Sequence, residues 1–520
     1  MKKLLFVFII AFMNSVTAQV QEDAWIFLND KPLANNYLNN PLSMLSQRAL
    51  DRRTRLNIVL DYKDVPIDVN YLNQIKTANG ITYLSHSKWL NAIHVQGSEN
   101  DIRSLLNFNF VDYIEFANKN IGIVNRPQPV EINNDNSNIP FSNYDYGNGY
   151  EQIHMLNGEL MHQQNYTGDN VLLAVIDAGF IDVDTDSFFQ NISIVDVYNF
   201  VSNNQNVYQY SSHGTAVLST IASNNPGQLV GTAPDIEVAL YVSEDVSQEM
   251  PIEETFWARA AERADSLGVD VINTSLGYKT FDNSNYNYTI NDLDGNTSFI
   301  SRAANIAVSR GISVVVSAGN SGNSLWASIG MPADAEGVIT VGAVDVNRTK
   351  AGFSSIGPTA DGRIKPDVMA LGLNASVYYN GVLTTSSGTS FSSPIIAGMV
   401  ACMIQAYPNK TPAQIKQDLI SISDRYANPD NEYGYGIPDF SQYQITNIAP
   451  DDEIEVVNFY PNPVENYIYT TKNTDYKIFT TDGKLVLSGK ITDKKIDIST
   501  FNDGIYYFLM DKVYYKIIKK

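Results

Sequence analysis

The pattern of apolar and polar residues between positions 150 and 445 alternates between helix and strand. A helical pattern over 258–267 ends at Gly268 and continues directly into the apolar run 269–274, and the same order recurs around Gly311. Glycine just past a helix ends it, and a continuous apolar run after it is typical of a strand buried on both faces of a parallel sheet. The pattern therefore predicts an α/β fold, a doubly wound and mostly parallel sheet with helices on both faces.

The segments on either side of this region follow other patterns. Before it, residues 23–119 have the pattern of a small α+β unit. Its strand patterns cover 89–95 and 110–114, and a short helical pattern covers 99–106. After it, the stretch from about 456 to 520 holds short runs of alternating polarity, which predict a separate all-β module, a β-sandwich.

Segments without apolar periodicity separate these units. Residues 120–148 are rich in Asn, Asp, Pro and Gly, a composition typical of a linker that proteases can cut. We expect an export signal at 1–18, the α+β unit at 19–120, a linker at 121–148, the α/β domain at 149–446, a second linker at 447–454 and the β module at 455–520.

The first residues have the features of an export signal. Two lysines precede a short apolar run at 4–13, and the small residues at 16–18 offer a cleavage site. Such a segment is a secretory signal peptide, because the apolar run is too short to span a bilayer. The alternative is a cytoplasmic protein with an apolar start. We expect a secreted or cell-surface protein.

A second apolar stretch, "SSGTSFSSPIIAGMVACMIQAYP", begins at Ser386. Its residues 391–406 are almost free of charge, but Pro394 and Gly398 interrupt them, and a spanning helix needs about twenty apolar residues. We therefore expect no stable membrane span. Because proline fits the first turn of a helix, this stretch predicts a buried core helix with Pro394 in its first turn.

Composition narrows the classes of function. With 44% hydrophobic and 18% charged residues, the chain is an ordinary globular protein. A formal charge of −21 argues against nucleic acids and anionic membranes as partners. The single cysteine, Cys402, cannot form an intramolecular disulfide, so stability must come from core packing, with structural Ca²⁺ as an open option.

Candidate functional residues follow three of the predicted strands. In an open parallel sheet, binding and catalytic sites form just outside the carboxyl ends of the strands. Two helical patterns also begin near this edge, one at His213 and one beside Ser390. The residues that follow the strands are Asp177, Ser275, Leu276, Gly277, Ala318, Gly319 and Asn320.

Asp177, His213 and Ser390 offer an acid, a base and a nucleophile. A serine hydroxyl is a weak nucleophile at neutral pH, so an imidazole must accept its proton, and a carboxylate must hold the imidazole in one tautomer. The Asn320 amide and the backbone N–H of Ser390 are candidate donors to the oxyanion that forms. The alternative is that the serine-rich segment is a turn and Asp177 a loop cap. The other four histidines lie in the N-terminal unit or ahead of the first sheet strand, which favours His213 as the base.

The stretches "AVIDAGF", "SSHGTAVLSTIA", "VSAGNSG" and "SSGTSFSSPIIAGMVA" together resemble the four signatures of the subtilase family, the subtilisin-like serine endopeptidases of S8 type. The resemblance covers about 150–445. It implies a peptide hydrolase with Asp177, His213 and Ser390 as its triad, Asn320 in the oxyanion hole and no cofactor for the chemistry.

The resemblance also implies where the substrate binds. The S1 pocket holds the substrate side chain before the cut bond. The resemblance places Ser275, Leu276 and Gly277 on one wall of this pocket and Ala318 and Gly319 on the other. The chain departs from the family at two places: Ala178 stands where serine or threonine is usual, and Phe391 where methionine is commoner. An insertion at 278–300 is expected to be a solvated loop, with Ca²⁺ binding or control of substrate access as alternatives.

The flanking units resemble known accessory domains. The N-terminal unit resembles the inhibitor-type propeptide of subtilases, and the C-terminal module, with "NFYPNPVENYIYTT" and "FNDGIYYFLM", resembles the type A sorting domain of the type IX secretion system. Together they imply a zymogen whose partners are protein or peptide substrates, its own propeptide as an intramolecular inhibitor, and the type IX secretion machinery.

Other interpretations remain open at this stage. The N-terminal unit has the alternative of an ordinary domain, and the C-terminal module that of a carbohydrate-binding or adhesive β-sandwich. The whole chain has the alternatives of a surface scaffold with a catalytically silent subtilase fold and of an α/β-hydrolase. The last would need a G-x-S-x-G motif, which residues 388–392 do not contain.

Overall fold

The computed structural model describes residues 20–121, 144–443, 459–460, 464, 466–470, 475–480, 484–510 and 513–520. The expected signal peptide at 1–18 and the second linker at 447–454 lie outside these residues, as does most of the first linker at 121–148. The chain forms two compact units, Met1–Thr446 and Asn447–Lys520.

A seven-stranded sheet forms the centre of the first unit. Its strands are β5 (Leu172–Asp177), β6 (Ser193–Asn199), β9 (Glu237–Val242), β10 (Val271–Thr274), β11 (Ser313–Ser317), β12 (Ile339–Val344) and β13 (Val368–Leu371). They lie in the order β13-β12-β11-β10-β5-β9-β6, and all neighbours run parallel. The predicted α/β architecture is confirmed. Two short hairpins pair β7 (Asn224–Asn225) with β8 (Leu229–Val230) and β14 (Ala375–Tyr379) with β15 (Val382–Ser386).

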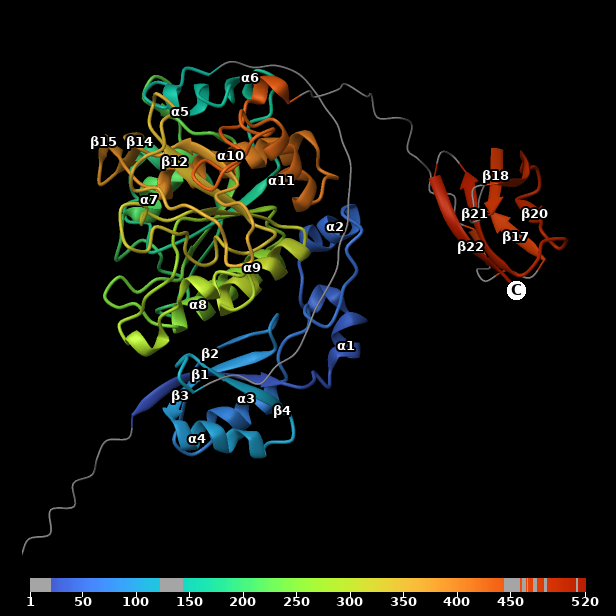
Figure 1. The fold of residues 1–520 in the computed structure, drawn as a ribbon, viewed down its shortest axis with the longest axis horizontal. Helices are drawn as coiled ribbons and strands as arrows, with labels where there is room; N and C mark the ends of the chain where they lie inside the picture. Colours follow the sequence, from blue (N-terminus) through green and yellow to red (C-terminus); the bar gives the residue numbers. More distant parts are fainter. Residues whose placement is uncertain are drawn as a thin grey trace, which may run out of the picture. The chain divides into compact units, whose positions relative to one another are not determined.

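Helices cover both faces of this sheet (Figure 1). They are α5 (Tyr150–His154), α6 (Glu159–His162), α7 (His213–Ala222), α8 (Ile252–Leu267), α9 (Phe299–Ser309), α10 (Thr389–Ala406) and α11 (Pro412–Ser421). The helices α7 and α10 belong to one buried cluster, and α8 and α9 belong to another. Alternate residues of β5 take part in each cluster, Leu173 in the first and Leu172 in the second. A strand covered on both faces requires this alternation of apolar residues.

Gly268 ends α8, as the sequence predicts. Its φ of 98° lies in the left-handed region, which glycine adopts without steric cost. A Cβ atom at this position would also lie 2.8 Å from the backbone nitrogen of Ala49, in the N-terminal part of the chain. Glycine therefore serves both the end of the helix and the close approach of a second segment.

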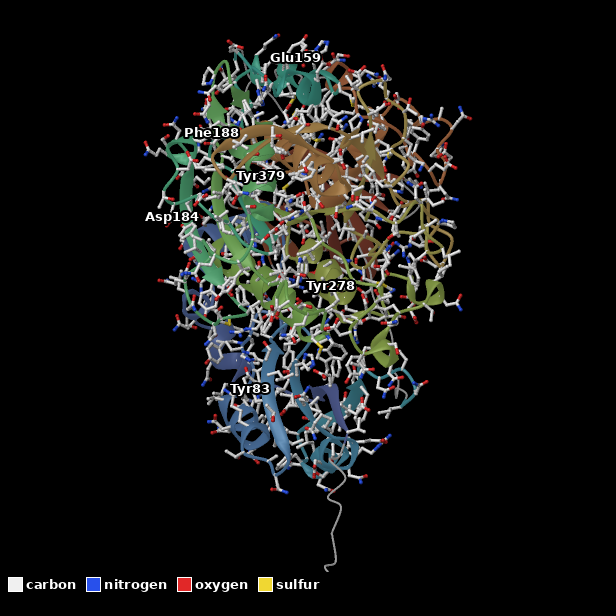
Figure 2. The ribbon with its side chains drawn as sticks, turned by 90° about the vertical axis from the view of Figure 1, so that its left-hand side faces the viewer. Tyr83, Glu159, Asp184, Phe188, Tyr278 and Tyr379 are labelled. Atoms are coloured by element: carbon white, nitrogen blue, oxygen red, sulfur yellow. The ribbon has the colours of Figure 1, made fainter. Side chains whose placement is uncertain are left out.

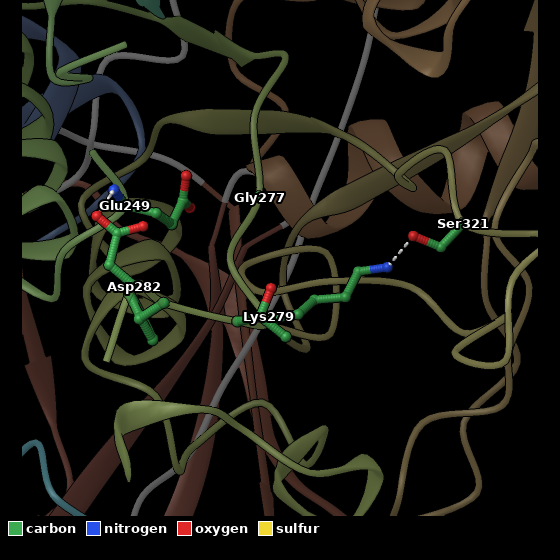
Figure 3. A pocket seen from close by; sticks show the side chains of 7 residues that line it. Glu249, Gly277, Lys279, Asp282 and Ser321 are labelled. Atoms are coloured by element: carbon green, nitrogen blue, oxygen red, sulfur yellow. Dashed lines mark hydrogen bonds between the residues drawn. The ribbon is translucent and has the colours of Figure 1, made fainter. Parts of the chain in front are cut away.

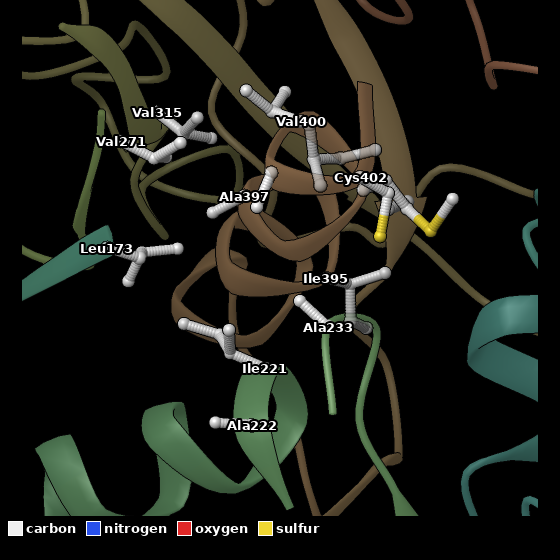
Figure 4. Close-up of a cluster of buried hydrophobic side chains, with 14 of the residues drawn as sticks. Leu173, Ile221, Ala222, Ala233, Val271, Val315, Ile395, Ala397, Val400 and Cys402 are labelled. Carbon is white, nitrogen blue, oxygen red and sulfur yellow. The ribbon is translucent and has the colours of Figure 1, made fainter. Parts of the chain in front are cut away.

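The helix α10 is the central helix of the domain core (Figure 4). Among the described residues it is the one helix long and apolar enough to cross a membrane, but 89% of it is buried inside the protein. The helix begins at Thr389, beside Ser390 as predicted, but Pro394 lies in its second turn and not in the first turn that the sequence predicts. The serines ahead of the apolar run, Ser392 and Ser393, are buried and helical, so the helix extends beyond the apolar run toward its N-terminus.

The insertion at 278–300 is only partly the solvated loop that the sequence predicts, because residues 289–291 are exposed whereas most of its aromatic residues are buried. Tyr278 (Figure 2), Tyr286 and Tyr288 are buried, with 1%, 3% and 4% of each residue exposed. The hydroxyl of Tyr288 donates a hydrogen bond to Glu254 at 2.8 Å. The rings supply apolar area while the hydroxyls bond to carboxylates, so a segment rich in Tyr and Asp can be buried.

The N-terminal part of the first unit is an α+β unit, as predicted. Its strands are β1 (Gln21–Leu28), β2 (Ile81–Ser87), β3 (Ala92–Ser98) and β4 (Val111–Phe116), in the antiparallel order β2-β3-β1-β4. Its helices are α1 (Ala34–Leu38), α2 (Gln47–Arg55), α3 (Val69–Lys76) and α4 (Glu99–Ser104). The strand predicted at 89–95 starts too early, because Asn91 occupies a turn with a φ of 50°.

This N-terminal sheet lies against α8 and α9. The ring of Trp25 stacks on Phe299 with centroids 4.9 Å apart, and its indole N–H donates to Thr255 at 2.9 Å. Glu262 of α8 accepts hydrogen bonds from the Ser87 hydroxyl at 2.6 Å and the Trp89 backbone N–H at 3.0 Å. The contact combines aromatic packing with hydrogen bonds to charged groups.

The second unit is all-β, which confirms the prediction for the C-terminal module. Its strands are β16 (Phe459–Tyr460), β17 (Tyr467–Thr470), β18 (Asp475–Thr480), β19 (Leu485–Lys490), β20 (Lys495–Asp497), β21 (Gly504–Met510) and β22 (Val513–Lys519). They form a three-stranded sheet, β16-β17-β20, and a four-stranded sheet, β19-β18-β21-β22. A small core of buried side chains, including Ile468, Ile478 and Phe508, holds the module together.

Candidate active site

Asp177, His213 and Ser390 all lie at the carboxyl edge of the parallel sheet. Asp177 is the last residue of β5, His213 the first of α7 and Ser390 the second of α10. Asp177 is 1% exposed and Ser390 9% exposed, whereas 37% of the His213 side chain is exposed. The edge therefore presents a buried acid, a half-buried imidazole and a nearly buried hydroxyl.

Asp177 and His213 are joined by a hydrogen bond. The distance from His213 Nδ1 to Asp177 Oδ1 is 2.7 Å, and the backbone N–H of Ala178 donates to the same oxygen at 2.7 Å. A carboxylate acceptor requires the proton on Nδ1, which leaves Nε2 free to act as a base. The charge of Asp177 raises the pKa of the His213 imidazole, burial opposes this shift, and the charge of Glu244 adds to it.

The structure places His213 beside the first turn of α10 but does not join it to Ser390 by a hydrogen bond within the described residues. The rings of His213 and Phe391, the residue after Ser390, have centroids 6.1 Å apart. The Ser390 hydroxyl donates to the Ser275 carbonyl at 3.3 Å. Rotation about the Cα–Cβ bond of a serine is a fast step between staggered positions, and catalytic hydrogen bonds often tighten only when substrate binds.

Pro394 explains how the backbone around Ser390 is held. Because proline has no N–H, it cannot donate to the carbonyl four residues earlier, which is that of Ser390. That carbonyl instead accepts a hydrogen bond from the Ser275 hydroxyl at 2.9 Å. The proline inside the helix thus leaves an acceptor that ties the first turn of α10 to the residue after β10.

Asn320 lies at the same turn, and its amide is oriented by its neighbours. Its Oδ1 accepts hydrogen bonds from the backbone N–H of Thr389 at 2.9 Å and from the Thr389 hydroxyl at 3.0 Å. Since these donors define the oxygen of the amide, Nδ2 is the group that remains as a donor. An ideal Cβ on Gly388 would lie 3.4 Å from Nδ2, which places this donor next to the start of α10.

The expected substrate-binding residues follow β10 and β11. Ser275 is 5% exposed, and Gly277 lines a pocket of about 410 Å³ together with Ser321, the neighbour of Asn320 (Figure 3). Gly319 has a φ of 101°, and an ideal Cβ there would lie 3.1 Å from the Ser355 hydroxyl. Of the five expected residues only Gly277 lines this pocket: Ser275 and Gly319 lie outside its lining, Leu276 packs against the α8–α9 cluster, and Ala318 is fully buried within that cluster.

Sequence reasoning missed one charged group near the site, Glu244. It follows β9, the strand beside β5, and accepts hydrogen bonds from the Tyr278 hydroxyl at 2.5 Å and the Ser243 hydroxyl at 2.6 Å. Burial raises the pKa of Glu244 to about 7, and the nearby charge of Asp177 acts in the same direction. The rule that located Asp177, a polar residue after a buried strand, would also have located Glu244.

No group of three or more His, Cys, Asp or Glu side chains that could hold a metal ion occurs in the part of the chain that the structure describes.

The insertion at 278–300 contributes residues to the pocket beside the candidate active site. Lys279, Thr280, Phe281 and Asp282 line the pocket beside Gly277, which favours the expected alternative that the insertion shapes substrate access.

Family models match three parts of the chain. The model described as the subtilase family, Peptidase S8, matches residues 168–436. The model for the Peptidase S8 propeptide domain of Bacteroidota matches 23–134, and that for a secretion system C-terminal sorting domain matches 458–520.

Individual proteins are similar to the central part of the chain. Subtilisin E of Bacillus subtilis (strain 168) is 34% identical over 289 residues, which cover 55% of this chain and 68% of that protein. Subtilisin DY of Bacillus licheniformis is 32% identical over 287 residues, covering 55% and 93%. The crystal structure of MycP1 from Mycobacterium smegmatis is 23% identical, with a TM-score of 0.44, covering 58% of this chain and 86% of that one.

Proposed function

Because this chain belongs to the subtilase family and is a subtilisin-like serine endopeptidase, we propose that Asp177, His213 and Ser390 form its catalytic triad. The observation that carries the proposal is the 2.7 Å hydrogen bond between Asp177 and His213 at the sheet edge where α10 presents Ser390. The matched relatives favour the endopeptidase over the silent scaffold and the α/β-hydrolase. The N-terminal unit is a propeptide domain, the C-terminal module is a sorting domain, and the protein is extracellular or lies on the cell surface.

In the proposed reaction, the Ser390 hydroxyl turns from the Ser275 carbonyl toward Nε2 of His213 and attacks the carbonyl carbon of a peptide bond. His213 takes the hydroxyl proton as the new C–O bond forms, and Asp177 stabilises the imidazolium through Nδ1–H. His213 then returns the proton to the leaving amine, which yields an acyl-enzyme on Ser390. A water molecule repeats the sequence and releases the acid product.

Asn320 supplies the proposed stabilisation of the oxyanion. Its Oδ1 is occupied by Thr389, so Nδ2 and the backbone N–H of Ser390 are the donors left for the negative oxygen. Both groups are in place before substrate arrives, because the amide is held by two hydrogen bonds and Ser390 by the helix. Preorganised donors of this kind need no rearrangement as charge develops.

The proposed triad is tested by Ser390→Ala in the full-length chain, with Ser387→Ala as the matched control. Ser387 lies in the loop three residues earlier, where its hydroxyl accepts from the Asn374 backbone N–H at 3.0 Å. We expect Ser390→Ala to abolish casein hydrolysis and fluorophosphonate labelling, and Ser387→Ala to keep both. Unchanged labelling of the Ser390→Ala protein would overturn the assignment.

The boundaries and partners are proposed as follows: signal peptide 1–18, propeptide 19–120, linker 121–148, catalytic domain 149–446, linker 447–454 and sorting domain 455–520. The propeptide would act as an intramolecular inhibitor until the linker is cut, and the sorting domain would engage the type IX secretion machinery. Mass spectrometry of the secreted protein tests this, since mature termini within the two linkers are expected and termini inside the catalytic domain would contradict it.

Chemistry in this family needs no cofactor. The structural Ca²⁺ that the sequence left open has no cluster of three candidate side-chain ligands in the described ranges. No step of the proposed reaction uses a metal ion.

A further inference from the structure

The pocket beside Gly277 contains one cationic side chain, that of Lys279. Figure 3 shows this side chain extending toward Ser321, while the carboxylates of Glu249 and Asp282 lie on the other side of the pocket. The pocket thus has a positive end and a negative end. The positive end is the one beside Ser321, which follows the proposed oxyanion residue in sequence.

Lys279 spans the gap between the two proposed walls of the substrate pocket. Its ammonium group donates to the Ser321 hydroxyl, on the segment after β11, and to the Ser328 carbonyl at 3.3 Å. An ideal Cβ on Gly330 would lie 3.3 Å from Lys279 Cε. The Gly330 nitrogen, in turn, lies 4.0 Å from an ideal Cβ on Gly319. The aliphatic part of Lys279 therefore lies over Gly330, next to the wall formed by Gly319.

The positive charge of Lys279 is not neutralised by the protein. Both of its hydrogen-bond acceptors are neutral oxygens, and no carboxylate lies within ion-pair distance of it among the described residues. An ammonium group has three donors; two are used here, and although the nitrogen also lies 5.7 Å from the centre of the Trp326 ring, no protein oxygen among the described residues takes the third donor. Burial lowers the pKa of Lys279 to about 8, and the group is therefore still mostly charged at neutral pH. The buried Lys365, by contrast, is paired with Asp367 at 2.8 Å.

We propose that Lys279 makes this pocket select a glutamate or aspartate side chain at the substrate residue whose carbonyl Ser390 attacks. The proposal rests on the proposed function, because it takes the segments after β10 and β11 as the walls of that pocket. A carboxylate placed here would gain a charge-assisted hydrogen bond from the free donor in a half-buried setting. The protein as a whole is acidic, with a formal charge of −21, so this preference has to arise locally from one side chain.

The wild-type protein tests the proposal first. Quenched fluorescent peptides that differ only at the residue before the cut bond, carrying Glu, Gln, Leu or Lys, are given to the mature secreted protein. We expect kcat/KM for the Glu peptide to exceed that for the Gln peptide by about 10- to 100-fold, the size of one hydrogen bond to a charged group. Equal rates on Glu and Gln peptides, or a preference for Lys through Glu249 and Asp282, would overturn the proposal.

Two variants then assign the preference to Lys279. In Lys279→Met we expect the Glu-to-Gln ratio of kcat/KM to fall to within about threefold of unity, whereas Lys279→Arg keeps the charge and most of the ratio. Because the readout is the ratio of kcat/KM for two substrates, a general loss of activity lowers both values equally and leaves the ratio unchanged. Lys350→Met is the matched control outside the pocket, where the one hydrogen bond of the lysine ammonium group within the described residues is to the Ser354 carbonyl at 3.5 Å. An unchanged ratio in Lys279→Met contradicts the proposal.

The same peptides distinguish an error in the triad from an error in the role of Lys279. If Ser390→Ala still hydrolyses the peptides, the triad is wrong. If hydrolysis depends on Ser390 but shows no preference for Glu, the triad stands and the role of Lys279 is wrong. The wild-type ratio decides the question even where the Lys279→Met protein does not fold.

Discussion

Both edges of the central sheet carry buried carboxylates, but these carboxylates have different partners at the two edges. At the amino edge, Asp265 at the end of α8 lies between Arg52 and Arg53 of the propeptide helix α2, and all three side chains are at most 2% exposed. At the carboxyl edge, within the described residues, Asp177 has the half-exposed His213 as its one ion-pair partner, and its Oδ2 accepts no hydrogen bond.

At the amino edge, buried arginine and aspartate side chains form ion pairs with one another. Arg53 donates to both oxygens of Asp265 at 2.8 Å, and Arg52 donates to Asp265 and to the carbonyl of Val269. Around them, Arg48 and Arg55 reach Asp270, which precedes β10. Buried charges are tolerated because each has partners, and removal of one partner leaves another charge unpaired.

The carboxyl edge is left incomplete. Asp177 and Glu244 together raise the pKa of one imidazole, and the amide donor of Asn320 lies next to the start of α10. A site that is to stabilise charges appearing during a reaction must not already be neutralised by its own residues. Buried ion pairs therefore occur at the edge of the sheet that the propeptide helix α2 contacts. Polar groups without such ion pairs occur at the edge where we place the catalytic residues.

The largest effect is expected from Asp177→Asn. The amide cannot hold the same His213 tautomer or stabilise the imidazolium, so we expect kcat at neutral pH to fall about 10⁴-fold. Single-turnover and steady-state kinetics on one peptide substrate measure this. Asp265→Asn, at the other edge, is expected to leave kcat of the mature protein within a factor of two. A comparable loss in both variants would break the distinction between the edges.

The next effect is expected from Asp265→Ala in a full-length chain that also carries Ser390→Ala to prevent processing. Arg52 would remain buried without its carboxylate partner, and Arg53 would keep only Asp64 at 2.9 Å, at a cost of about 3–5 kcal/mol in the free energy of unfolding. Thermal and denaturant unfolding measure this cost. The control is Asp361→Ala, whose ion pair with Arg363 is more exposed and is worth less than about 1 kcal/mol. Equal effects of the two substitutions would show that the paired cluster does not hold the propeptide.

A smaller effect is expected from Asn320→Asp. The carboxylate keeps an acceptor for the Thr389 N–H but loses the Nδ2 donor, so we expect kcat to fall about 10² to 10³-fold, the loss known for an oxyanion donor of subtilisin, with little change in KM. Asn320→Ala removes both functions and should lose at least as much. If Asn320→Asp retained wild-type kcat, the amide would have a role in holding Thr389 and none in the reaction.

The smallest effect is expected from Glu244→Gln. His213 must be neutral to act as a base, so kcat/KM rises with pH as the imidazole loses its proton. The charge of Glu244 raises the pKa of His213, so its removal should move this rise to lower pH. The shift is small because burial raises the pKa of Glu244 to about 7, which leaves it partly protonated there. Glu432→Gln, at an exposed position, should leave the profile in place, and a shift to higher pH in Glu244→Gln would contradict this account.

Much of the fold and the positions of the candidate residues followed from local sequence signals. Gly268 marked the end of α8, and apolar runs marked the buried strands. These signals are local, because they depend on the backbone conformation and burial of single residues and their neighbours in sequence. The rule for carboxyl ends of parallel strands then selected Asp177 and Asn320. The same signals failed at Pro394, where buried serines extend the helix, and in the insertion, where tyrosine rings become core.

What the sequence by itself determined was the class of fold, the order of the domains and the set of residues able to do the chemistry. Only the tertiary structure decided which charges meet. Arg53 and Asp265 are 212 residues apart, and Lys279 reaches Ser321 over 42 residues, so no local pattern links them. Ion pairs and hydrogen bonds depend on distances of a few ångströms, and those distances exist only once the sheet, its helices and the propeptide have packed together.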